Sequence, residues 1–282
     1  MKRFALQVFH FFIYSNLFIA ACAVLMVNQT CRFLLHESPD KYFFLFVFFS
    51  TICSYSFHWY LTSHSVMPSH RILWLKQNRK THLVLFFIGL LGCGFFFFYL
   101  LSYWYWLLPA AIFTFLYSAP KISNKYFRAL LKLALGKTIF LALVWMYVTS
   151  FLPILISGQP WKNDFTLFII SRYFLIYTIC ILFDYRDRED DKAAGIRSLI
   201  TFLNKRSVFY LFVFSLCIFA VATIWMLQFG YGLLNIGILL LPAVITASLY
   251  NYAVRNFSDM LYYFVLDGLI ALSAIIMLIT GI

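Results

Sequence analysis

Residues 165–191 read FTLFIISRYFLIYTICILFDYRDREDD, an apolar run that ends in a dense group of charges. The run 165–183 contains one charged side chain, Arg172. A helix of about 20 apolar residues is long enough to cross the hydrocarbon core of a bilayer. The run therefore predicts a membrane-spanning helix, and the charges after it predict the water-facing end of that helix.

The rest of the chain repeats this alternation of apolar runs and short charged loops. The sequence is 63% hydrophobic and 11% charged, which no ordinary soluble domain requires. We expect an all-α membrane protein, with residues 1–282 forming a single transmembrane domain of about nine helices. An eight-span count stays open, because the third and fourth runs are separated only near Ser102. The runs lie near residues 4–28, 42–62, 83–101, 103–119, 133–156, 165–183, 207–228, 232–250 and 260–281.

Basic residues predict the orientation, because Lys and Arg of short loops collect on the cytoplasmic side. With a cytoplasmic N-terminus and an outside C-terminus, only Arg32, Lys41 and Lys162 of the 22 basic residues lie outside, and Arg172 lies within a helix. The loops 63–82 and 184–206 then form cytoplasmic caps. We expect an integral protein of a bacterial cytoplasmic membrane. The net charge of +12 reflects this topology and does not indicate a nucleic-acid partner.

Half of the ten acidic residues fall within 184–191. Asp184, Asp187 and Asp191 are spaced i, i+3 and i+7, so a helix would bring their carboxylates to one face. Such carboxylates repel each other unless a cation joins them, and Mg²⁺ prefers oxygen ligands, including phosphate oxygens. A solvated loop in which acids and bases pair locally is the alternative. The complementary bases are Arg186, Arg188, Lys192 and Arg197.

Residues 184–199, DYRDREDDKAAGIRSL, resemble the second aspartate motif of the UbiA superfamily of intramembrane prenyltransferases. The spacing is DxxDxxxD after the sixth expected span, followed by a Lys, a Gly and Arg-Ser. Residues 117–121, YSAPK, are similar to the Tyr-x-x-Pro stretch of that superfamily with its following basic residue. The resemblance implies nine helices in one bundle around a central cavity, with cytoplasmic loops that cap it.

The resemblance also implies an activity, the transfer of a polyprenyl group from its diphosphate to an aromatic or other lipophilic acceptor within the membrane lipid. Mg²⁺ would bind Asp184, Asp187 and Asp191, with Asp187 and Asp191 as catalytic residues. Mg²⁺ would stabilise negative charge on the diphosphate as the allylic C–O bond breaks. The residues expected to bind the diphosphate are Lys121, Arg71, Lys76, Lys192 and Arg197.

The chain departs from the superfamily at the end of the second span, where a first aspartate motif is normal. No acidic residue occurs between Asp40 and Asp164, and Tyr55, His58 and Thr62 take the motif's positions. Three interpretations remain: one Mg²⁺ at the second motif with bases holding the diphosphate, a different lipid-linked substrate, or a lipid-binding scaffold without catalysis. A transporter is disfavoured, because the sequence lacks paired interrupted helices.

Two charges fall inside expected spans, Arg172 in the sixth and Asp267 in the ninth. An unpaired charge in the hydrocarbon region is costly and usually finds a partner inside the bundle. We therefore expect Arg172 and Asp267 to lie at similar depth and to pair. A separation above about 10 Å would exclude the pair, since attraction over that distance is weak.

Overall fold

The computed structural model describes residues 2–62, 69–118, 137–193 and 198–281. These residues are almost entirely helical, and none of them lies in a β-strand. The helices are α1 (Lys2–Tyr14), α2 (Leu17–Gln29), α3 (Lys41–Leu61), α4 (His70–Gln77), α5 (Arg79–Phe98), α6 (Trp104–Ser118), α8 (Lys137–Met146), α9 (Leu152–Ser157), α10 (Asn163–Arg186), α11 (Arg188–Ala193), α12 (Leu199–Phe202), α13 (Lys205–Trp225), α14 (Leu233–Ala253) and α15 (Asp267–Thr280). Short π- and 3₁₀-helices join or extend them: η1 (Thr30–Leu34), η2 (Leu101–Tyr103), η5 (Tyr147–Phe151), η6 (Met226–Phe229) and η7 (Leu261–Leu266).

Eight helices in the described part of the chain are long and apolar enough to cross a membrane. Helix α6 has 15 residues, a length of about 22 Å, and takes the place of the run expected at 103–119. The all-α membrane bundle is therefore confirmed, with about nine crossings when α6 is included. The eight long helices are Leu17–Leu34, Lys41–Leu61, Arg79–Phe98, Lys137–Ser157, Asn163–Arg186, Lys205–Phe229, Leu233–Ala253 and Leu261–Thr280.

The first expected span, residues 4–28, is wrong as a single helix. Helix α1 ends at Tyr14, and Asn16 adopts a left-handed conformation with φ 69° before α2 begins. Asparagine tolerates this region better than most residues. Asn16 is buried, donates to Ser56 Oγ and accepts from Arg71 Nη2. These tertiary hydrogen bonds stabilise a break that hydropathy does not reveal.

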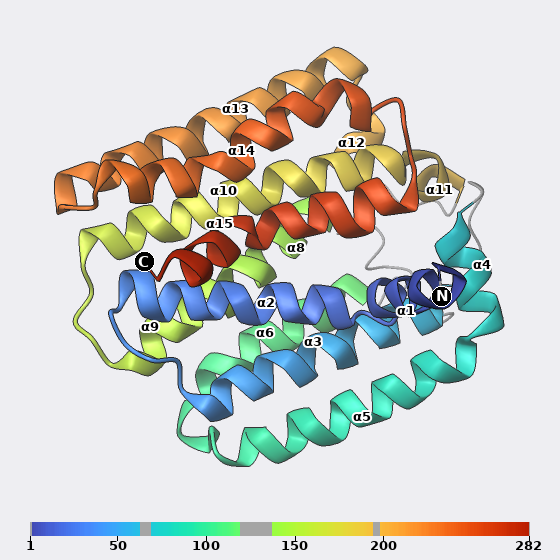
Figure 1. Cartoon of the computed structure of the whole chain (residues 1–282), viewed down its shortest axis with the longest axis horizontal. Coiled ribbons are helices and arrows are strands. Elements are labelled where there is room, and N and C mark those ends of the chain that lie inside the picture. The colour runs from blue at the N-terminus through green and yellow to red at the C-terminus, as the bar shows by residue number, and fades with distance from the viewer. Residues whose placement is uncertain (1, 63–68, 119–136, 194–197, 282) are drawn as a thin grey trace.

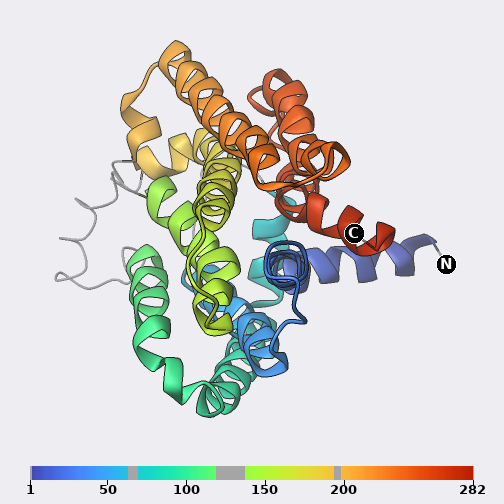
Figure 2. The ribbon, with the colours of Figure 1, turned by 90° about the vertical axis from the view of Figure 1, so that its left-hand side faces the viewer.

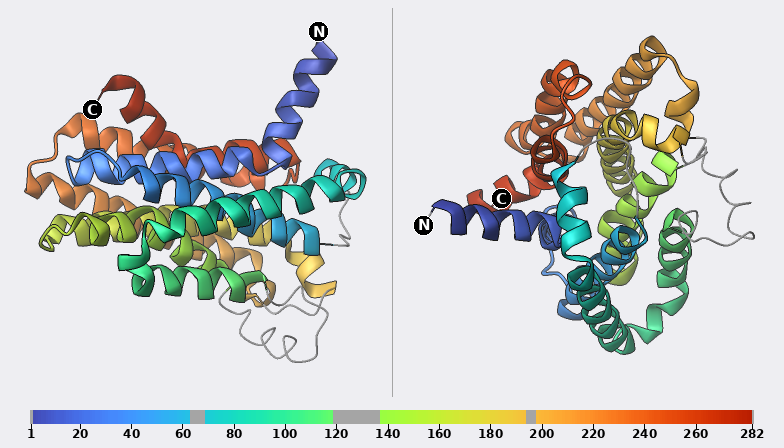
Figure 3. Two further views of the ribbon diagram at one scale, coloured as in Figure 1. Left: turned by 90° about the horizontal axis from the view of Figure 1, so that it is seen from below. Right: turned by 90° about the vertical axis from the view of Figure 1, so that its right-hand side faces the viewer.

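The long helices run side by side, and the short capping helices gather at one end of the bundle (Figure 1). Helices α1, α4 and α11 lie at this end, which we call the cap end, and the C-terminus lies at the opposite end. Helix α1 leaves the bundle at an angle (Figure 3). Opposite ends for the two termini agree with an odd number of crossings.

Helix α10 lies near the middle of the bundle when the helices are seen end-on (Figure 2). It packs against α8 on one side and α13 on another, and also contacts α14 and α15. Ile176, Ile179 and Ile181 on successive faces of α10 are all fully buried. A helix that is apolar on every face is typical of such a central position. The central position of α10 brings the acidic segment that follows it into the middle of the cap end.

Candidate functional site

A cavity of about 1320 Å³ extends from the cap end into the bundle between α3, α6, α8, α10 and α15. Its lining on the α8–η5–α9 segment runs from Lys137 to Leu152, roughly 22 Å of helix. The lining at the cap end is charged, whereas Val144, Val148 and Leu152 make it apolar further in. The central cavity expected from the sequence is therefore present, with one polar end and an apolar body.

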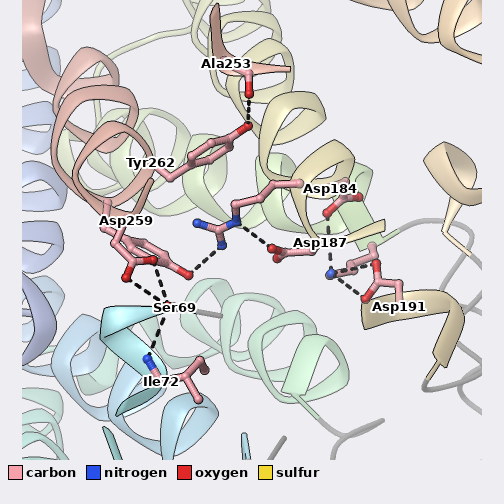
Figure 4. A network of polar contacts seen from close by, with 11 residues as sticks. Ser69, Ile72, Asp184, Asp187, Asp191, Ala253, Asp259 and Tyr262 are labelled. Carbon is pink, nitrogen blue, oxygen red and sulfur yellow. Dashed lines mark hydrogen bonds and ion pairs between the residues drawn. The ribbon is translucent and has the colours of Figure 1, made fainter. Parts of the chain in front are cut away.

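Asp184 and Asp191 lie on either side of a single ammonium group, that of Lys137 (Figure 4). Lys137 Nζ is 3.6 Å from Asp184 Oδ1 and 3.1 Å from Asp191 Oδ2. Thr138 Oγ1 donates a hydrogen bond to Asp184 Oδ2. Both carboxylates are buried. Two acidic residues from α10 and α11 thus converge on one point, and the first residue of α8 places a positive charge there.

The aspartate stripe is split, because Asp187 does not join the other two. Asp187 is the residue that ends α10, and its Oδ1 accepts a hydrogen bond of 2.8 Å from Arg186 Nε. The side chain of Asp187 is also the most exposed of the three, at 34%. Burial raises the pKa of Asp191 to about 6, while the Lys137 ammonium acts in the opposite direction. The structure therefore brings Asp184 and Asp191 together and turns Asp187 toward Arg186.

Two guanidinium groups share one aromatic ring beside these acids. Arg71 Cζ lies 4.1 Å and Arg186 Cζ 4.5 Å from the ring centroid of Tyr263. Arg71 also stacks on Trp59 at 4.0 Å and donates to Asn16 Oδ1 at 2.7 Å, and Arg186 Nη2 donates to Tyr263 Oη at 2.6 Å. Burial lowers the pKa of Arg71. Arg71 Nε and Arg186 Nη1 are buried and have no hydrogen-bond partner among the described residues.

The three residues at the positions of a first aspartate motif, Tyr55, His58 and Thr62, all line the cavity from α3. Tyr55 Oη accepts a hydrogen bond from Trp145 Nε1 at 3.0 Å. His58 Nδ1 lies 3.3 Å from the hydroxyl of Ser118. This side of the cavity therefore presents hydroxyls and an imidazole where the resemblance leads one to expect carboxylates.

The residues expected to bind diphosphate separate into three groups. Arg71 lines the cavity, whereas Lys76 and Lys192 are exposed and are not among the lining residues. Lys192 forms a surface pair with Glu189 at 2.9 Å. Lys121 and Arg197 lie outside the described residues. The structure therefore places Arg71 at the cavity and places Lys76 and Lys192 away from it.

The expected pair between Arg172 and Asp267 is wrong. Arg172 Nη1 donates to Ser273 Oγ at 3.1 Å, and Ser273 lies six residues beyond Asp267 on α15, about 9 Å along the helix. Asp267 instead lines the cavity, with Arg71 and Arg186 as the positive charges that act on it. The rotation of α10 about its axis turns Arg172 toward Ser273, and a hydropathy pattern contains no information on that rotation.

Acidic side chains outnumber basic ones in the described cavity lining, which favours a bound cation. The described residues contain no group of three or more His, Cys, Asp or Glu side chains able to hold a metal ion. Mg²⁺ usually binds through one or two carboxylates and takes its remaining ligands from water and substrate phosphates. The convergence of Asp184 and Asp191 on a cationic group fits that donor set. The charged lining residues are Asp184, Asp187, Asp190, Asp191, Asp259, Asp267, Arg71, Lys137 and Arg186.

Lys137 is the residue of this charged cluster that the sequence analysis did not single out. It was counted as one of many cytoplasmic bases, and 47 residues separate it from Asp184. Its position as the first residue of an apolar helix, directly before a threonine, was the only available signal. Such a signal places a lysine at a membrane surface and does not select its partner.

Comparison with known proteins identifies the family of this chain. The sequence model of the UbiA prenyltransferase family matches residues 62–260. No curated protein and no solved structure matched the chain. The matched range includes α10 and α11, the Lys137 helix and most of the cavity wall. On this match, the chain belongs to the UbiA prenyltransferase family.

Proposed function

We propose that this protein transfers a polyprenyl group from its diphosphate to a lipophilic acceptor inside the membrane. One observation carries the proposal: a single cavity joins a charged cap end to a long apolar body. A prenyl diphosphate has the same division between a charged head and an apolar chain. The head would lie at the cap end beside Asp184 and Asp191, and the chain would extend along α8 toward Leu152.

The chain's own residues explain how the diphosphate would be held. Arg71 Nε and Arg186 Nη1 supply N–H groups that have no hydrogen-bond partner in the described part of the chain, and guanidinium groups bind phosphate oxygens well. Asp184 and Asp191 would bind Mg²⁺, which neutralises the negative charge that develops on the leaving diphosphate. Lys137 keeps the two carboxylates close together before that ion and the substrate arrive.

The apolar body of the cavity would protect the allylic cation that forms as the C–O bond breaks. Exclusion of water prevents its hydrolysis. Trp145 and Tyr55 present aromatic groups to this space, and an aromatic face attracts a cation. The arrangement therefore supplies charge at the leaving group and an apolar, aromatic surface at the carbon that reacts.

A non-catalytic lipid-binding or scaffold role is the second candidate. The observation that favours it is the neutral set Tyr55, His58 and Thr62 on α3, where a second group of carboxylates was expected. A scaffold would bind prenyl lipids without breaking the C–O bond. Diphosphate release therefore separates the two functions.

The test is incubation of the purified protein with radiolabelled prenyl diphosphates of several lengths, Mg²⁺ and lipophilic phenols. We expect diphosphate release and a labelled product. Val148→Trp should shorten the apolar body and shift the preference toward shorter donors by about tenfold, as steric exclusion in a pocket does. Ile139→Trp on the exposed face of α8 is the control. No release from any donor would favour the scaffold.

The cap end is proposed to face the cytoplasm of a bacterial cell, with the N-terminus inside and the C-terminus outside. The concentration of Lys and Arg in the cap loops supports this orientation. Lys192 is exposed on α11, so a Lys192→Cys variant reports the side directly. A membrane-impermeant thiol reagent should label it in inverted vesicles and leave it unlabelled in intact cells, whereas the reverse pattern would refute the orientation.

A further inference from the structure

Asp267 is a cavity carboxylate for which the described residues supply no hydrogen-bond or ion-pair partner. It is the first residue of α15 and faces the same cavity as the aspartates of α10 and α11. No residue that the structure describes donates a hydrogen bond to it or forms an ion pair with it. Asp267 is half-buried and lines the cavity, so its carboxylate oxygens can accept a hydrogen bond from a molecule that enters. Its position therefore suits a ligand that brings a hydrogen-bond donor.

The surroundings of Asp267 place it deeper than the proposed diphosphate site. It lies six residues inside the span that begins at Leu261, about 9 Å from the cap end of that span. Tyr55 lies at the same distance from the cap end of α3, at Leu61, and lines the same cavity as Asp267. Asp184, by contrast, is only two residues from the end of α10.

At this depth the cavity would hold the atoms of the substrates that react. With the diphosphate at the cap end, the first carbon of the prenyl chain lies one step further into the cavity, at the level of Tyr55 and Asp267. Helix α3 contributes no carboxylate there, but α15 does. The part of the site where α3 lacks acidic residues therefore contains one carboxylate, and α15 supplies it.

The residues around Asp267 argue against a second metal ion at this point. The charged groups that act on its carboxylate are Arg71 and Arg186. The side chain that α3 contributes at the same depth ends in the neutral hydroxyl of Tyr55, which is a poor substitute for a carboxylate at Mg²⁺. A neutral molecule with a hydroxyl group suits such surroundings better than a further dication.

We propose that Asp267 binds the acceptor, which is a lipophilic alcohol or phenol, by accepting a hydrogen bond from its hydroxyl group. The inference rests on the proposed prenyl transfer. In that reaction the allylic C–O bond breaks and its electron pair leaves with the diphosphate. A new bond forms between the prenyl carbon and the hydroxyl oxygen of the acceptor, and the O–H bond of the acceptor breaks with loss of its proton. Asp267 receives this proton, directly from the hydroxyl group.

The test compares two probes, 4-octylphenol and its methyl ether, which differ only in the hydroxyl hydrogen. Binding to the purified protein is measured by quenching of tryptophan fluorescence. We expect the wild type to bind the phenol at least tenfold more tightly than the ether, and Asp267→Asn to reduce that ratio several-fold, because an amide oxygen accepts a weaker hydrogen bond than a carboxylate. Ile270→Val, one turn further along α15 in the same cavity wall, should keep the wild-type ratio.

The outcomes distinguish this inference from the proposed function. Equal binding of phenol and ether by the wild type, or an unchanged ratio in Asp267→Asn, would overturn the role of Asp267 even if prenyl transfer is observed. Ether binding at the wild-type level shows that the variant is folded. If Asp267→Asn loses the preference for the phenol but the wild type releases no diphosphate from any donor, the acceptor site is retained and the proposed prenyl transfer is refuted.

Kinetics give a second measurement if transfer is found. Asp267→Asn should lower kcat with the phenol about 100-fold, within the range of a lost general base, and leave the affinity for a non-reactive prenyl thiodiphosphate within threefold. Asp267→Glu should restore part of kcat, because it restores the carboxylate. A parallel loss of thiodiphosphate affinity would place Asp267 at the donor and contradict the proposal.

Discussion

Asp191→Asn is expected to lower the rate of diphosphate release about 10²–10³-fold, the usual cost of removing one electrostatic contact to a developing charge. Asp191 is buried and shares the Lys137 ammonium with Asp184, so its carboxylate belongs to the point where a cation would meet the diphosphate. Asparagine keeps the shape and removes the charge. The measurement is single-turnover release from a radiolabelled prenyl diphosphate in the presence of Mg²⁺.

Two further variants make this prediction specific. Glu189→Gln removes a charge from the same short helix, but Glu189 pairs with Lys192 at the surface and is absent from the cavity lining. It should release diphosphate at the wild-type rate. Asp187→Asn should lose less activity than Asp191→Asn, because Asp187 turns toward Arg186. Equal rates for Asp191→Asn and the wild type would remove this carboxylate from the mechanism.

Lys137→Met is expected to destabilise the protein by about 3–5 kcal/mol in EDTA, the usual cost of removing one partner from a buried charge cluster. Asp184 and Asp191 would then face each other without a cation between them. Mg²⁺ should bind the variant in place of the ammonium. We therefore expect millimolar Mg²⁺ to raise the Tm of Lys137→Met in detergent by several degrees more than that of the wild type.

The control is Lys192→Met, which breaks an exposed pair and should leave the Tm unchanged in both buffers. The double variant Lys137→Met with Asp184→Asn should recover stability in EDTA, since one carboxylate no longer repels the other. If Mg²⁺ shifts the Tm of Lys137→Met no more than that of Lys192→Met, the two carboxylates do not bind a divalent ion at this position.

The membrane spans could be predicted closely because their signal is local. The run expected at 165–183 became α10, Asn163–Arg186, and the run at 232–250 became α14, Leu233–Ala253. The prediction of a single helix over residues 4–28 was wrong for a reason that lies far away in the sequence. Asn16 breaks that helix through hydrogen bonds to Ser56 and Arg71, which lie far along the chain.

The candidate site could be predicted only in part. The i and i+7 positions of the acidic segment do share a face, because the chain stays nearly helical across the end of α10, where Asp191 N donates to Asp187 O. Asp187 lies apart from the other two carboxylates, since the end of that helix allows its side chain to turn to Arg186. The ion pairs of Lys137 could not be predicted, because they depend on a contact between α8 and α10 that no spacing in the sequence specifies.

What the sequence by itself determined is the membrane bundle, the approximate bounds of its helices and the position of the acidic segment at one helix end. Burial in hydrocarbon depends on local composition, and local composition can be read along the chain. Only the tertiary structure decided which charges meet: Lys137 with Asp184 and Asp191, Arg172 with Ser273, and Asp267 with the cavity. Those contacts depend on how each helix is rotated about its axis, and many distant side chains set that rotation together.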